Sequence, residues 1–169
     1  YYMQSKQDAG GTRIMKYSGT LLCVRDIRRA KAFYEELFGC EVAMDLGVHV
    51  AFKDGIFLQE EQSWLEFIQK SKETLTYGGN DKELYFDTHD LDAFVEKLMT
   101  YQVELVHPLR EHGWGQRVIR FYDPDRHIIE VGEHMGDVAR RFLATGMTME
   151  ETARRMDVPM EMLTGFLAE

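Results

Sequence analysis

The chain has 169 residues, a length typical of one domain with a small appendage. Hydrophobic residues make up 44% and charged residues 29%, which excludes a collagen-like or wholly disordered chain. The net charge of -9 disfavours nucleic acid or an anionic membrane as the main partner. Because no apolar run reaches the length of a membrane span and the first residues lack the apolar core of a signal peptide, we expect a cytoplasmic protein.

Composition divides the chain into three parts. Residues 1–14 are polar, without periodicity, and are expected to be a tag or a disordered tail. Residues 15–135 carry the regular apolar patterns of a domain, and residues 136–169 form a helical appendage. The two cysteines, Cys23 and Cys40, are too few for a disulfide framework, and the apolar surroundings of Cys23 indicate a buried thiol.

The first half of the domain predicts one strand, one helix and three further strands. Residues 17–24 are strand-like, and residues 27–38 have helical spacing, with Asp26 as the N-cap and Gly39 as the stop. Three short strand patterns, separated by glycine-containing turns, then follow at 40–45, 49–53 and 56–60. The polar stretch 61–80 is predicted to be a linker.

The second half repeats this order. A strand at 83–88 leads into a helix that begins after Asp90, which lies 64 residues beyond Asp26. Three more strands follow at 103–107, 117–122 and 127–132. The sequence therefore predicts an α+β fold: two β-α-β-β-β units that form a curved mixed sheet with a cleft, plus C-terminal helices.

Alternation along the strands predicts which side chains face the helices and which face the cleft. In 83–88, Leu84 and Phe86 form the apolar set, so Glu83 and Tyr85 face the cleft. The same phasing places Ile56, Leu58, Ile119, Phe121, Ile129 and Val131 on the helix side. It places Phe57, Gln59, Arg120, Tyr122 and Glu130 on the cleft side.

Three segments resemble a known superfamily. They are VRDIRRAKAFYEELFG at 24–39, LYFDTHDLDAFVEKL at 84–98 and FYDPDRHIIEV at 121–131. Together with the duplication they are similar to the vicinal oxygen chelate superfamily, which includes glyoxalase I, extradiol dioxygenases and bleomycin-binding proteins. The resemblance implies a homodimer whose clefts bind a small organic molecule. Arg126 stands where the family's hairpin usually has glycine, so the turn must tolerate a side chain there.

The resemblance also implies where a metal would lie. The family's four ligand positions correspond to Gly19, Gln59, Glu83 and Glu130. This set has no imidazole or thiolate donor, so we expect no metal and no other cofactor. A hard divalent cation held by Gln59, Glu83 and Glu130 is the alternative. No two of the six histidines show the spacing of metal ligands.

Two carboxylates are the candidate catalytic groups. Glu83 and Glu130, if buried together, would form a metal site or an acid/base pair. Glu83 has no evident basic partner on its own strand, whereas Arg120 is the expected cross-strand neighbour of Glu130 and could make it merely structural. The candidate ligand-binding residues are Gln59, Phe57, Tyr85, Arg120 and Tyr122.

The appendage raises one further function. Thr148 and Glu151 form a capping box, and GMTMEETARRMDVPMEML is similar to the helix-turn-helix of bacterial regulators. From residue 135 onward there are 4 basic and 6 acidic residues, however, and a groove-reading helix needs a basic face. We therefore expect the appendage to pack on the domain or on a second subunit.

Three functions remain open on the sequence alone. The first is a metal-free protein that binds a small organic ligand. The second is a metal-dependent lyase or isomerase of the glyoxalase type that uses Glu83 and Glu130. The third is a ligand-sensing transcriptional regulator that acts through its C-terminal helices.

Overall fold

The computed structural model describes residues 15–169, so the expectation for residues 1–14 lies outside the described part of the chain. The first unit consists of β1 (Thr20–Val24), α1 (Ile27–Phe38), β2 (Val42–Asp45), β3 (His49–Phe52) and β4 (Ile56–Glu60). Its sheet has the order β1-β4-β3-β2, with β1 parallel to β4 and the other pairs antiparallel. Asp26 caps α1 by accepting from the backbone N–H groups of Arg28 and Arg29, as predicted. Gly39 ends the helix in the left-handed conformation, with φ 71°.

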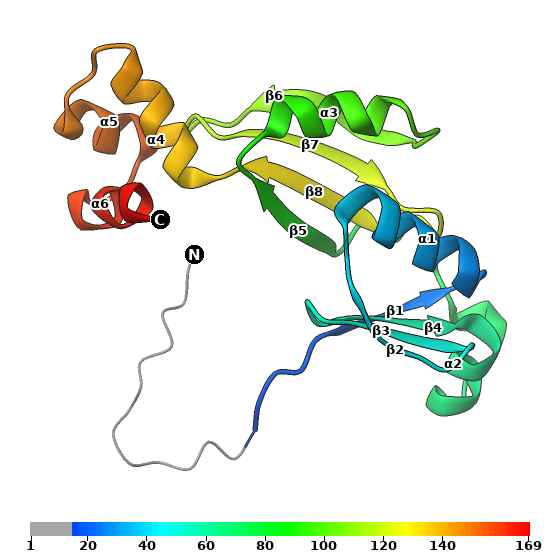
Figure 1. Cartoon of the computed structure of the whole chain (residues 1–169). Helices are drawn as coiled ribbons and strands as arrows, with labels where there is room; N and C mark the ends of the chain where they lie inside the picture. The colour runs from blue at the N-terminus through cyan, green and yellow to red at the C-terminus, as the bar shows by residue number, and fades with distance from the viewer. Residues whose placement is uncertain (1–14) are drawn as a thin grey trace.

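The second unit repeats the first. It consists of β5 (Glu83–Thr88), α3 (Leu91–Met99), β6 (Leu105–Glu111), β7 (Arg117–Tyr122) and β8 (Ile128–Glu133). Its sheet has the order β5-β8-β7-β6, again with one parallel pair between the first and last strands. The predicted α+β duplication is confirmed, and the expected mixed sheet consists of two four-stranded sheets (Figure 1).

The stretch predicted as a linker is partly helical, so that prediction was wrong for its first half. Residues 61–80 contain α2 (Glu61–Ile68) and the 3-10 helix η1 (Lys72–Thr74). Leu65 is buried, and Ser63 near the start of α2 donates to the carbonyl of Glu60. The apolar residues Trp64, Leu65, Phe67 and Ile68 were the available signal, hidden among polar neighbours.

One apolar core joins the two units. The residues predicted to face the helices lie in this core or pack against it: Ile56, Leu58, Leu84, Phe86, Ile119, Phe121, Ile129 and Val131. Phe38 at the end of α1 connects the units, because its ring stacks on Phe86 of β5 at 4.3 Å between centroids and lies 6.3 Å from Phe121 of β7. The helix-facing sides of both sheets are therefore buried together in this core.

The appendage has a small core of its own. It consists of α4 (Met135–Ala144), α5 (Met149–Met156) and α6 (Met160–Ala168), which extend from the end of β8 (Figure 1). Their shared core includes Val138, Ala139, Phe142, Ala153, Met156 and Leu163. The predicted capping box at Thr148 and Glu151 is present.

Two arginines fasten the appendage to the β6–β7 hairpin. Arg155 donates to the carbonyl of Gly113 at 2.5 Å and Arg141 to that of Gly115 at 2.5 Å. Gly115 has φ 92°, and a Cβ added to it would lie 2.3 Å from the ring of Phe142. The appendage therefore contacts its own domain, which is one of the two placements expected from the sequence. Among residues 15–169, no helix has the length and apolar character to cross a membrane.

Candidate functional site

Arg120 lies at the centre of the predicted site. In the antiparallel pair β7–β8 it is directly opposite Glu130, with which its Nη2 forms an ion pair. Its Nε donates to Oε2 of Glu83 on β5 over 2.9 Å, and its Nη1 lies 3.2 Å from Nε2 of His107 on β6. One guanidinium therefore joins all four strands of the second sheet.

Both candidate catalytic glutamates, Glu83 and Glu130, are paired with Arg120. The Glu130 side chain is only 7% exposed, so its charge needs a partner, and Arg120 provides it. The cross-strand pairing of Arg120 with Glu130 was predicted. No basic partner was found for Glu83 on its own strand, and Arg120 is its partner as well. A single positive charge lies between the two carboxylates and offsets their mutual repulsion.

The residues at the family's metal positions do not fit a metal. Gly19 has no ligand atom, and a Cβ added there would lie 2.0 Å from the carbonyl oxygen of Gly55. Gln59 is 1% exposed, and its amide is already used by two neighbours: Oε1 lies 2.8 Å from Nδ1 of His49, and Nε2 donates to Ser63 at 2.5 Å. The remaining two positions are the glutamates that Arg120 holds, and a guanidinium between them would repel a cation.

The structure also shows which predicted residues are not brought together. Phe57 and Gln59 lie on β4 of the first sheet, where the ring of His49 stacks on Phe57 at 6.0 Å between centroids. Glu83, Arg120 and Glu130 belong to the second sheet, and the contacts described above stay within one sheet each. His49 and His107 were not predicted, although both lie beside a predicted residue across a strand pair.

The two predicted tyrosines have different environments. Tyr85 is 52% exposed on β5, and its hydroxyl accepts from Nε2 of Gln116 at 2.9 Å. Tyr122 is buried at the end of β7, and its hydroxyl donates to Oδ1 of Asn80 at 2.6 Å. Tyr85 therefore has an exposed ring on the open side of the sheet, whereas Tyr122 mainly holds the segment that precedes β5.

The Asp-Pro-Asp turn has a structural role in this chain. Asp123 accepts from the hydroxyl of Tyr34 at 2.9 Å, and burial together with this carboxylate raises the pKa of Tyr34. Asp125 accepts from Nε of Arg25 at 2.9 Å, so the turn bonds the second unit to the first. Arg126 adopts φ 69°, which confirms that the turn accepts a side chain where glycine is usual.

A surface hollow of about 710 Å³ lies beside this turn rather than at the predicted site. It runs between the start of α1 and the β7–β8 turn, and its walls carry Arg25, Arg29, Arg126, Asp26, Glu36 and Glu104. Of the predicted ligand-binding residues only Tyr122 borders it. Its charges are mixed and largely paired: Arg25 with Asp125, and Arg126 with Glu104.

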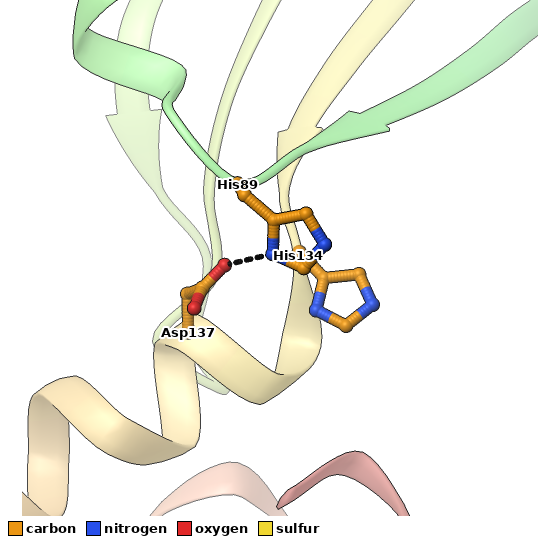
Figure 2. Close-up of side chains that lie close together, drawn as sticks. All are labelled: His89, His134 and Asp137. Atoms are coloured by element: carbon orange, nitrogen blue, oxygen red, sulfur yellow. Dashed lines mark hydrogen bonds and ion pairs between the residues drawn. The ribbon is translucent and has the colours of Figure 1, made fainter. Parts of the chain in front are cut away.

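A second cluster of chemically competent side chains lies at the junction with the appendage (Figure 2). It consists of His89 in the turn after β5, His134 at the N-cap of α4 and Asp137 in the first turn of α4. Nδ1 of His89 lies 2.6 Å from Oδ2 of Asp137, and the two imidazole rings are 4.3 Å apart between centroids. Sequence spacing did not indicate this cluster, because its three members are distant from one another in the chain or belong to different elements.

The comparisons with known proteins agree with this fold. The family model described as a glyoxalase-like domain matches residues 17–136. A protein of unknown function from Agrobacterium tumefaciens str. C58 is 42% identical, with a TM-score of 0.64, and the match covers 70% of this chain and 94% of that chain. No curated protein matches the chain.

Two more distant structures support the fold alone. One is a glyoxalase/bleomycin resistance protein/dioxygenase family enzyme from Burkholderia phytofirmans PsJN, with 20% identity, a TM-score of 0.63, and coverage of 70% of this chain and 98% of that chain. The other is lactoylglutathione lyase from Agrobacterium tumefaciens, with 24% identity, a TM-score of 0.55, and coverage of 69% and 92%. The appendage lies beyond the residues that the family model matches. The chain belongs to the glyoxalase-like domain family, within the vicinal oxygen chelate superfamily.

Proposed function

We propose that this protein binds a small organic ligand on the open side of its sheets, without a metal at the family's usual positions. The observation that carries the proposal is the place of Arg120, whose guanidinium lies between Glu83 and Glu130 where the family would use carboxylates as metal ligands. Gly19 supports it, since that position supplies no donor and accepts no side chain.

The exposed groups of the second sheet suggest what such a ligand needs. Tyr85 offers an exposed aromatic ring, while Arg120 and Glu83 are partly exposed and offer a charged donor and an acceptor. A molecule with a flat apolar part and a polar group would match both. Glu130, being buried behind Arg120, tunes the guanidinium rather than meeting the ligand.

The binding unit in this proposal is a homodimer. Phe57 and Gln59 lie on the first sheet, whereas Arg120 and its two glutamate partners lie on the second. The two groups of residues that would line one cleft can therefore come from two different copies of the chain. A second copy that places its first sheet against the other's second sheet would combine them. We include a cytoplasmic location in the proposal, since Cys23 and Cys40 are both free thiols.

The two alternative functions have less support. A metal-dependent lyase or isomerase would need Glu83 and Glu130 free to hold a cation, and both are paired with Arg120. A transcriptional regulator would need basic residues on its helices, and Arg141 and Arg155 are used to fasten the appendage to the β6–β7 hairpin. The ion pairs of Arg120 therefore argue against the metal-dependent enzyme, and the contacts of Arg141 and Arg155 argue against the regulator.

A thermal-shift screen of small organic molecules in the presence of a chelator tests the proposal. A ligand that binds only the native state raises the melting temperature, by an amount that grows with the logarithm of its concentration relative to its Kd. We expect ligands that shift the parent protein but not Tyr85→Ala, with Arg110→Met, a change at an exposed position on β6, as the matched control. A second screen replaces the chelator with a divalent cation, and the proposal fails if ligands stabilise the protein only in that screen.

A further inference from the structure

The cluster at the junction of domain and appendage draws its members from separate elements. His89 follows β5, His134 lies between β8 and α4, and Asp137 belongs to α4. One ligand atom from each lies within 4.8 Å of the other two, and Figure 2 shows the three side chains converging. This cluster lies outside the Arg120 site, and none of its members occupies a position where the family places its metal.

We propose that His89, His134 and Asp137 form a binding site for a divalent transition metal, with zinc as the best match. Zinc takes imidazole nitrogen and carboxylate oxygen, and three protein ligands with water in the fourth position are a common arrangement. Magnesium and calcium prefer all-oxygen sites, so two imidazoles select against them.

The geometry allows coordination after small side-chain movements. Tetrahedral zinc with bonds of about 2.0–2.1 Å places its ligand atoms about 3.4 Å apart. The distance of 2.6 Å between Nδ1 of His89 and Oδ2 of Asp137 would lengthen on metal binding. Ligand atoms of the three residues that are now up to 4.8 Å apart would move closer together. The His89 side chain is 67% exposed, so it is free to move and leaves the site accessible from solvent.

Neighbouring groups already orient two of the ligands. The backbone N–H of Gly136 donates to Nδ1 of His134 over 3.2 Å, which assigns the lone pair to Nδ1 and the proton to Nε2. Oε2 of Glu169 lies 3.4 Å from that Nε2, as in the carboxylate–histidine–metal arrangement that holds metal-binding imidazoles. Arg140 donates to Oδ1 of Asp137 and leaves Oδ2 of that carboxylate for the metal. At His134 the metal would bind the lone pair of Nδ1, in place of the N–H of Gly136.

Such a site would add to the contacts that Arg141 and Arg155 make between domain and appendage. His89 belongs to the domain and Asp137 to the first helix of the appendage, while Glu169 after α6 lies beside His134. Metal bound there would fasten α4 to the turn after β5 and, through His134, would hold the end of α6. The metal therefore acts as a clamp between domain and appendage.

Titration of zinc into chelator-stripped protein tests the proposal, with competition against a chromophoric chelator as the readout. We expect one zinc per chain, with magnesium and calcium failing to compete. His89→Ala and Asp137→Asn should weaken binding by at least about 100-fold, and Glu169→Gln by about 10-fold, in the range known for outer partners of metal ligands. His112→Ala, a histidine in the β6–β7 hairpin, should bind like the parent.

Two outcomes would overturn the proposal. The first is a parent protein that binds no zinc at micromolar concentrations. The second is stoichiometric binding that His89→Ala and Asp137→Asn leave unchanged, which would place the metal elsewhere. His89 is exposed, so its replacement should leave the fold intact, and circular dichroism checks this. The clamp is tested by limited proteolysis: zinc should slow cleavage between α4 and α6 in the parent and not in His89→Ala, and equal rates in the parent would refute the clamp.

Discussion

Replacing Arg120 by methionine removes the charge that holds the site together and keeps a side chain of similar length. Glu130 would then be 7% exposed with no cation beside it, and Glu83 would lie near it as a second negative charge. Breaking a fully buried ion pair by removing one partner costs about 3–5 kcal/mol. The Arg120 side chain is 21% exposed, so water offsets part of the loss and we expect about 2–3 kcal/mol.

Thermal unfolding followed by circular dichroism measures this loss, which for a chain of this size corresponds to a fall of about 5–10 °C in the melting temperature. Glu83→Gln removes only the more exposed partner and should cost less than about 1 kcal/mol. The double variant Arg120→Met with Glu130→Met should recover much of the stability, because no buried charge remains. A melting temperature for Arg120→Met equal to that of the control Arg110→Met would refute this reasoning.

Three further outcomes follow from the packing. Gly19→Ala should destabilise the protein by more than about 2 kcal/mol in urea unfolding, since its Cβ would collide with the carbonyl of Gly55; an unchanged midpoint would show that β1 can shift. Burial, with a smaller contribution from a nearby carboxylate, raises the pKa of the Cys40 thiol to about 11, so it carries little thiolate at neutral pH. It should react slowly with a thiol reagent until denaturant is added, and rapid reaction in the native protein would contradict its burial. Arg155→Met removes the hydrogen bond to the carbonyl of Gly113 and should speed proteolysis of the appendage without affecting ligand binding on the sheets. An unchanged proteolysis rate would mean that Arg155 contributes little to holding the appendage on the domain.

Strand alternation was enough to predict which side chains face the helices, although Gln59, Tyr122 and Glu130 on the other phase are also buried. Leu84 and Phe86 are in the core and Glu83 and Tyr85 on the open side, because a period of two leaves only one phase that buries the apolar set. The duplicated order of strands was predicted for the same reason, since each half carries the same succession of periods. These patterns determine on which face of its own strand each side chain lies.

Contacts between distant segments could not be predicted in this way. Arg120 reaches Glu83, 37 residues earlier, because β8 pairs with both β5 and β7 and brings the two side chains onto one face. His89 and Asp137 are 48 residues apart and meet only because β5 and β8 end at the same edge of the sheet. Both contacts, Arg120 with Glu83 and His89 with Asp137, could have been inferred from the parallel pairing of β5 with β8.

The central claim is that the guanidinium of Arg120 occupies the place of the family's metal. Titration of manganese(II), followed by electron paramagnetic resonance in the His89→Ala background, tests it without interference from the junction site. The signal of free manganese should remain undiminished up to millimolar concentration. One tightly bound manganese per chain that is lost in Glu130→Gln would contradict it.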